Sequence, residues 1–437
     1  MAAVRERCWQ LPSVDRGLLG CLSEQKRAAD SATMNKEIEY TSRYQNVRYK
    51  ADTEYVVRVA KILLTPVGIW PRNDSFLDNV KMFVQTGTMF SLMCFLLIPH
   101  AIYTYFDCEN LSRYMKVIAA QVFSLLAIIK FCVIIINRRK VMVCLTEMEA
   151  QYRDVACEDD RLVMVNCARI GRSFTKLYLG LCYGGALPYH VILPLLSEKV
   201  VKQDNSTQLP LPYLSDYVFF VIEDSPIYEM TFALQILISS IILSANCGTY
   251  SLIVAITMHC CSLFEVTNKR IEMLLRRKQR DLHDRLVKIV RYHLKAIEYS
   301  TMVEQTLSIV FLSDIVGCTL VICFLEFGVI VEWEDRKTLN TVTYFVLMTA
   351  ILVNVFIICF IGDRLKQQSE KVGETLYSVP WYNFPEGVAK NIRTIILRTS
   401  HPTSLTGAKL FNVSLQAFCD VFKTSAAYLN FFRAMTT

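Results

Sequence analysis

The chain has 437 residues, of which 53% are hydrophobic and 20% are charged, and its mean hydropathy is +0.31. This composition is too apolar for an average soluble protein and indicates a membrane protein. The net charge of +7 comes from the connections between apolar segments, so it does not indicate nucleic-acid binding.

Six apolar segments are long enough to cross a bilayer, which takes about 20 residues in a helix. A β-barrel would instead show shorter segments of alternating polarity. We therefore expect an all-α fold, a seven-transmembrane helical bundle whose seventh and weaker segment covers about 405–432. The six stronger segments are about 83–106, 116–137, 174–197, 230–258, 305–331 and 340–362.

Basic residues are distributed unequally between the two sides of the expected membrane. Connections 138–173, 259–304 and 363–404 hold twenty-three Lys and Arg, whereas the alternate connections hold five. The positive-inside rule then predicts a cytoplasmic N-terminus and an extracellular C-terminus. In agreement, Asn205-Ser-Thr207 is an N-glycosylation acceptor in a connection that this orientation places outside.

The parts between the spans also carry structural signals. Residues 1–33 have mixed charge and little periodicity, which is typical of disorder. Apolar residues recur at helical spacing beyond the spans, among many Lys and Arg, and predict cytoplasmic helical extensions that form a subunit-packing base. The expected parts are 1–82 (cytoplasmic N-terminal region), 83–258 (spans 1–4), 259–304 (cytoplasmic helical extension), 305–362 (spans 5–6), 363–404 (cytoplasmic helical element) and 405–437 (last span).

Polar residues recur every fourth position along the last segment, at Asn412, Gln416, Asp420 and Thr424. This spacing places them on one slightly drifting face of a helix. Polar groups at membrane depth are costly unless they face protein or water. The stripe therefore predicts a water-filled path or, alternatively, polar contacts between helices.

Three sequence elements together make the chain resemble the insect odorant receptors over nearly its whole length from Met34. They are Gly68-Ile-Trp-Pro71, the pattern Tyr377-x-x-x-Trp-Tyr-x-x-Pro385, and the block Gly407-Ala-Lys-Leu-Phe-x-Val-Ser-Leu-x-x-Phe418 with Tyr428 beyond it. The terminal block is the most specific of the three. The long insertion of the shared co-receptor is absent, so the chain looks like a tuning subunit.

The resemblance implies a ligand-gated, non-selective cation channel in which four subunits surround one pore. The last helix would line the pore, and the shared co-receptor would complete a heterotetramer in the plasma membrane of a sensory neuron dendrite. Phe431 and Met435 continue the polar stripe and match the family's apolar constriction, so they are the expected gate. Lys423 and Arg433 depart from a cation-conducting pattern.

The resemblance also implies an odorant pocket in the outer half of the bundle. A largely apolar pocket would take a small volatile or lipid-like ligand, with membrane lipid around the helices. Aromatic, small and polar residues at helical spacing in the outer half-helices are the candidates, although ordinary packing would explain any one of them. They are Val117, Gln121, Ser124, Tyr183, Leu187, His190, Phe232, Ile236, Ser239, Tyr344 and Met348.

Lys130 and Asp314 are charges within expected spans, for which structural pairing and snorkelling are alternatives to a functional role. The sequence has no Gly-rich phosphate loop and no His/Cys metal spacing, so we expect no enzyme, no cofactor and no metal. A gustatory-type receptor channel and a secondary transporter are the alternative functions, the latter requiring internal repeats that are not evident.

Overall fold

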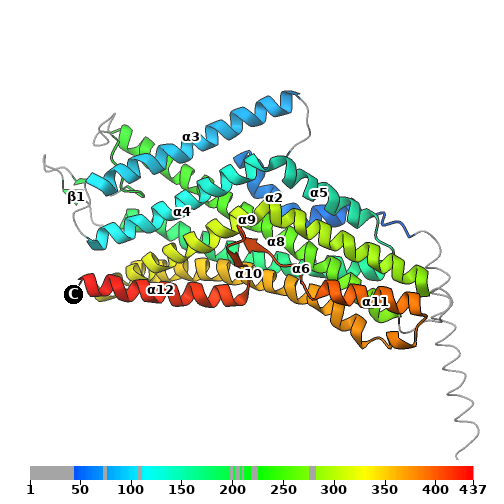
Figure 1. Ribbon diagram of the computed structural model, residues 1–437. Coiled ribbons are helices and arrows are strands. Elements are labelled where there is room, and N and C mark those ends of the chain that lie inside the picture. The colour runs from blue at the N-terminus through cyan, green and yellow to red at the C-terminus, as the bar shows by residue number, and fades with distance from the viewer. Residues whose placement is uncertain are drawn as a thin grey trace, which may run out of the picture.

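The protein is almost wholly helical in the computed structural model of Figure 1, which describes residues 44–71, 76–106, 111–196, 200–201, 207–208, 211–217, 225–274 and 282–436. Two short antiparallel strand pairs accompany the helices: β1 (Val200–Val201) with β2 (Thr207–Gln208), and β3 (Thr406–Gly407) with β4 (Phe411–Asn412). The helical elements are α2 (Tyr49–Val67), α3 (Phe76–Phe106), α4 (Leu111–Ile136), α5 (Arg138–Arg153), α6 (Glu158–Leu187), η1 (Pro188–Ile192), α7 (Leu193–Leu196), α8 (Ile227–Leu274), α9 (Leu282–Glu334), α10 (Thr338–Ser378), η3 (Trp381–Asn383), α11 (Glu386–Thr399) and α12 (Leu415–Thr436).

Six helices of the described chain are long and apolar enough to cross a membrane. They are α3, α4, α6 with its continuation to Leu196, α8, α9 and α10, and they coincide with the six predicted segments. The 22 residues of α12 run beside α9 and α10 as a seventh, less apolar helix (Figure 1). The prediction of an all-α bundle is confirmed.

Several helices extend well beyond a bilayer. With 48 and 53 residues, α8 and α9 are each more than about 70 Å long at 1.5 Å per residue, roughly twice the hydrocarbon thickness. Their extensions pack with α2, α5, α11 and the end of α10 at the right of Figure 1, a region called the base below. Close packing there depends on Gly248 of α8, because a Cβ at this position would lie 2.6 Å from Leu64 of α2.

The last segment differs from its prediction in where the helix begins. A hairpin of β3 and β4 precedes α12, and Ala408 and Lys409 form its turn with positive φ angles of 49° and 62°. The expectation that Asn412 shares the helix with the rest of the stripe is therefore wrong, because Asn412 lies in β4. The hairpin packs against α10 at Gly362, where a Cβ would overlap the carbonyl oxygen of Val413.

Two predictions fall outside the described residues. These are the disorder of residues 1–33 and the glycosylation of Asn205.

Candidate functional site

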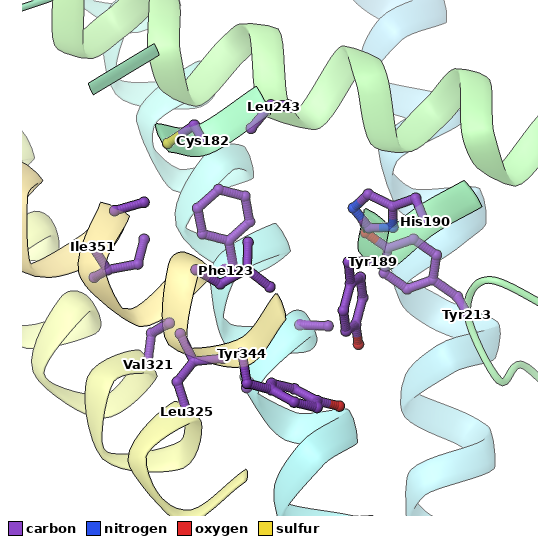
Figure 2. A pocket seen from close by; sticks show the side chains of 14 residues that line it. Phe123, Cys182, Tyr189, His190, Tyr213, Leu243, Val321, Leu325, Tyr344 and Ile351 are labelled. Carbon is purple, nitrogen blue, oxygen red and sulfur yellow. Dashed lines mark hydrogen bonds between the residues drawn. The ribbon is translucent and has the colours of Figure 1, made fainter. Parts of the chain in front are cut away.

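A mostly apolar cavity lies between α4, α6, α8, α9 and α10 in the half of the bundle away from the base (Figure 2). Small and aliphatic side chains form most of its wall, and four aromatic or heteroaromatic rings gather at one end. The lining residues are Ala119, Ala120, Phe123, Cys182, Tyr189, His190, Tyr213, Leu243, Val321, Leu325, Tyr344, Leu347, Ala350 and Ile351.

The aromatic end consists of Tyr189, His190, Tyr213 and Tyr344, which contact one another in sequence (Figure 2). Tyr189 meets Tyr344 edge-on with ring centroids 6.0 Å apart, and it meets His190 edge-on at 5.0 Å. His190 stacks on Tyr213 with centroids 5.1 Å apart and an interplanar angle of 20°. These offset and edge-to-face arrangements are the ones that aromatic rings favour.

The backbone of α6 changes its pitch where it supplies Tyr189 and His190. Residues Pro188–Ile192 form a π-helical turn, η1, in which each backbone bond spans one residue more than in an α-helix. Tyr189 follows Cys182 by seven residues, two turns of a regular helix, so both would share one face even without the wider turn. The wider turn changes the angle between successive side chains, and His190 lines the cavity beside Tyr189.

Two of the eleven predicted ligand residues, His190 and Tyr344, line this cavity. Tyr183 and Leu187 instead lie on the surface of α6, with 38% and 59% of their area exposed. They were grouped with His190 on the assumption of a regular α-helix, and the π-helical turn separates His190 from their face. Met348 is partly buried and packs beside the cavity-lining residues of α9 and α10.

The remaining predicted residues do not line the cavity. On α4, Val117 and Ser124 are buried, and the Gln121 amide donates a 2.8 Å hydrogen bond to the carbonyl oxygen of His100. On α8, Phe232 and Ile236 are half-buried and Ser239 is buried. Their part in ligand binding stays a prediction.

Tyr213 belongs to an irregular segment, and its place in the site had no signal in the sequence. Gln235, fully buried on α8, anchors this segment through two bonds to the backbone of Tyr213. Its Oε1 accepts from the Tyr213 N–H at 3.0 Å, and its Nε2 donates to the Tyr213 carbonyl at 3.1 Å. The position of Gln235, a polar residue within an apolar span, was the one hint of this contact in the sequence. The sequence does not show which segment Gln235 bonds to.

A buried ion pair between Lys130 of α4 and Asp314 of α9 lies two helical turns from the cavity wall. Each charged residue is seven positions from a lining residue, Phe123 and Val321 respectively. The two side chains are only 3% and 1% exposed. Of the alternatives left open by the sequence, the structure supports pairing.

One face of α12 packs on the bundle while its polar stripe remains uncovered. Val421 and Ser425 are buried, and the Ser425 hydroxyl donates to Oε1 of Glu326 at 3.2 Å. Gln416, Asp420 and Thr424 are exposed on the other side of the helix. Farther along, Phe431 is 59% exposed, whereas the side chain of Met435 lies outside the described part of the chain.

Within the polar stripe, side chains bond along the helix. The Gln416 amide donates to Oδ1 of Asp420 at 3.0 Å, and the Thr424 hydroxyl donates to the Asp420 carbonyl at 2.7 Å. These short-range bonds satisfy part of the stripe, but the Asp420 carboxylate still faces outward. A single copy of the chain therefore presents a polar surface at the depth of its spans.

The spans, the apolar cavity and the exposed polar helix define a multi-pass membrane protein whose bundle contains a cavity lined mostly by apolar and aromatic side chains. A family model described as "7tm Odorant receptor" matches residues 110–426, nearly three quarters of the chain. The chain therefore belongs to the 7tm odorant receptor family, a family of receptors rather than enzymes. The predicted family and the multi-pass membrane location are confirmed.

Individual relatives are distant. The chain is 25% identical to Odorant receptor 67c of Drosophila melanogaster over 43% of this chain and 46% of that receptor. It is 20% identical to Odorant receptor 9a of Drosophila melanogaster over 80% of this chain and 88% of that receptor. For several curated relatives, the match spans less than half of the relative's length.

Among solved structures, the fold matches the insect olfactory receptor OR5 from Machilis hrabei in complex with eugenol. The TM-score is 0.76 at 16% sequence identity, and the match covers 89% of this chain and all of the other. The structure of the same receptor described without a ligand gives a TM-score of 0.74 and also 16% identity. At this identity the likeness establishes the fold.

Proposed function

We propose that the chain is the odorant-binding subunit of a ligand-gated, non-selective cation channel. A small apolar odorant occupies the cavity between α4, α6, α8, α9 and α10, and its binding opens a pore lined by α12. Four subunits surround that pore, and a shared co-receptor supplies the others in a heterotetramer within the lipid of the plasma membrane. The proposal extends the family membership to this chain's own activity.

The observation that carries the proposal is the uncovered polar face of α12. Gln416, Asp420 and Thr424 are exposed along a helix whose opposite face packs on the bundle. The Gln416 amide donates to the Asp420 carboxylate, but this carboxylate still carries a charge that hydrocarbon does not solvate. Placing a charge there costs roughly 2.5–3.5 kcal/mol on insertion scales. Water in a pore between subunits removes that cost, and a carboxylate ring at Asp420 would favour cations.

The cavity supports the ligand-binding half of the proposal. Its lining is largely aliphatic and aromatic, so a small apolar molecule gains about 25 cal/mol per Å² of area removed from water. The complex of Machilis hrabei OR5 with eugenol provides a precedent for a small aromatic ligand in this fold.

The orientation in the membrane belongs to the same proposal. The excess of Lys and Arg in connections 138–173, 259–304 and 363–404 favours a cytoplasmic base and an outward-facing cavity. It also places Asn205 outside, where a glycan can be added. Loss of a glycosidase-sensitive mass shift in Asn205→Gln, together with an inaccessible tag at residue 35 in intact cells, is the expected result.

Whole-cell current during application of eugenol and other small odorants, with and without a co-receptor, tests the function. We expect currents that need both chains, and we expect Phe123→Ala to raise the half-maximal concentration because it removes a cavity wall. Phe345→Ala is the matched control, since it makes the same truncation at an exposed side chain of α10. Equal responses of both variants and the wild type, at equal surface expression, would place the ligand elsewhere.

The pore assignment has its own test. Asp420→Asn should lower the permeability of divalent relative to monovalent cations, because it removes a negative charge from the conduction path. Phe422→Leu is the control, since Phe422 is exposed on a different face of the same helix. An unchanged permeability ratio in Asp420→Asn would remove α12 of this subunit from the ion path.

A further inference from the structure

The hydrogen bonds at the aromatic end of the cavity specify what chemical group a ligand should carry. Among the described residues that line the cavity, Nδ1 of His190 is the buried side-chain polar atom with no hydrogen-bond partner. An unpaired buried polar group costs about 1–3 kcal/mol. A ligand that bonds to this nitrogen would remove the cost.

The other imidazole nitrogen of His190 already has a partner. The Tyr213 hydroxyl lies 3.4 Å from Nε2, within hydrogen-bond distance. Figure 2 shows the imidazole with one nitrogen beside the Tyr213 hydroxyl and the other on the side of Phe123.

A neutral imidazole carries one N–H, and an apolar cavity disfavours a charged one. If Nε2 donates to the Tyr213 oxygen, Nδ1 is an acceptor; if the Tyr213 hydroxyl donates to Nε2, Nδ1 carries the hydrogen and is a donor. A hydroxyl group both donates and accepts, so it can bond to Nδ1 in either case, whereas an aldehyde or an ether only accepts.

We propose that His190 selects ligands that carry a hydroxyl group, because such a group satisfies Nδ1 in either tautomer of the imidazole. The ligand class is a small alcohol or phenol with an apolar body. Its hydroxyl bonds to Nδ1 while its body contacts Phe123 and the aliphatic wall. The inference rests on the proposed ligand-binding function of the cavity and names its ligand class.

The test compares benzyl alcohol, benzaldehyde and benzyl methyl ether. The three compounds have similar apolar bodies, but of these only the alcohol can donate a hydrogen bond. The readout is the ratio of half-maximal concentrations, ether over alcohol, for currents in cells that also express the co-receptor. Loss of one buried hydrogen bond corresponds to up to about tenfold in affinity. His190→Phe should therefore lower this ratio by up to about tenfold, chiefly through weaker response to the alcohol.

Tyr213→Phe gives a measurement that a purely structural role would leave unchanged. Without the tyrosine oxygen, Nε2 has no partner to donate to, so the imidazole can place its hydrogen on Nδ1 and donate it to a carbonyl. We therefore expect the response to benzaldehyde to strengthen relative to the response to benzyl alcohol. The control is Tyr105→Phe, which removes a hydroxyl from an exposed side chain of α3 and should keep the wild-type ratios.

Several results would overturn the inference. Ratios unchanged in both His190→Phe and Tyr213→Phe, at normal surface expression, would show that His190 does not select a hydroxyl group. If Phe123→Ala still weakened all three responses, the proposed binding function would stand while the hydroxyl assignment failed. Absence of current with all three compounds in the wild type would contradict an alcohol or phenol ligand class.

Discussion

Two ion pairs, one near the cavity and one in the base, join helices in contrasting ways. Beside the cavity, Lys130 meets Asp314 in an almost solvent-free position, and no described residue gives the Asp314 carboxylate another hydrogen bond. In the base, Arg161 of α6 binds Asp52 of α2 with two bonds of 2.7 and 2.8 Å, and Asn46 adds a third at 3.0 Å.

The two ion pairs differ in the contacts that the carboxylate keeps when its basic partner is removed. Asp52 would keep its bond from Asn46, and 9% of its side chain is exposed. Asp314 would become an uncompensated charge among apolar helices, which typically costs about 3–5 kcal/mol. We therefore expect the loss of one partner to cost less in the base than beside the cavity.

The largest effect is expected for Lys130→Met, which strands the Asp314 charge. It should lower the free energy of unfolding by about 3–5 kcal/mol, seen as a lower melting temperature of the detergent-solubilised protein. The double variant Lys130→Met with Asp314→Leu should recover most of this loss, since apolar side chains of similar volume replace the pair. A double variant as unstable as the single one would mean that packing, not charge, sets the effect.

Gly362→Ala tests the joint between α10 and the hairpin that leads into α12. The added Cβ overlaps the Val413 carbonyl oxygen, so the backbone must shift, at a cost of about 1–3 kcal/mol. We expect reduced surface expression and smaller odorant-evoked currents. Gly387→Ala is the control, because a Cβ there meets no atom within 4 Å; equal behaviour of the two variants would contradict the close contact.

A smaller effect is expected for the pair in the base. Burial raises the pKa of Asp52, but hydrogen bonds from Arg161 and Asn46 outweigh it and lower the pKa below its ordinary value of 3.8. The stabilisation is therefore present above the ordinary pKa and is lost as the pH falls through the lower folded-state value. Arg161→Met should cost about 1–2 kcal/mol between about pH 5 and 8.

The measurement is the melting temperature of wild type and Arg161→Met as a function of pH. The two curves should run parallel across the neutral range and converge only in acid, where Asp52 becomes protonated in both. Convergence near neutral pH would mean that another titrating group controls the pair.

The smallest of these effects is expected for a substitution at Phe431, which lies beyond the polar stripe of α12 on the side away from the base. If it closes the pore by excluding water, Phe431→Ser should raise the current in the absence of ligand. Phe422→Ser is the control, because it makes the same change on a different face of α12. Resting currents equal to wild type in both variants would leave gating to the other subunits.

The spans and their extensions could be predicted because they depend on local composition and periodicity. A run such as Thr338 to Gly362 without a charged residue has few stable environments other than a bilayer. The apolar positions of 259–304 likewise repeat at helical spacing, and α8 and α9 continue through them on either side of an undescribed stretch. The start of α12 was misplaced because a hairpin with its turn at Ala408 and Lys409 interrupts an otherwise continuous apolar pattern.

The cavity depended on tertiary structure. His190 and Tyr344 were found as polar or aromatic residues within spans, but Phe123, Cys182 and Leu243 look like ordinary packing residues in the sequence. Whether a residue lines a cavity depends on the space that remains between several helices. The periodicity of a single helix therefore cannot predict it.

What the sequence by itself determined is the membrane class, the helices, the family and the polar stripe, since each arises from residue type at fixed spacing. Tertiary structure alone decided that the π-helical turn carries His190 away from Tyr183, and that Gln235 holds Tyr213 against it. The physical reason is that hydrogen bonds between distant segments exist only where folding brings those segments together. Nε2 of His190 has a partner only because the segment bearing Tyr213 lies beside it, which leaves Nδ1 as the unpartnered nitrogen in the cavity.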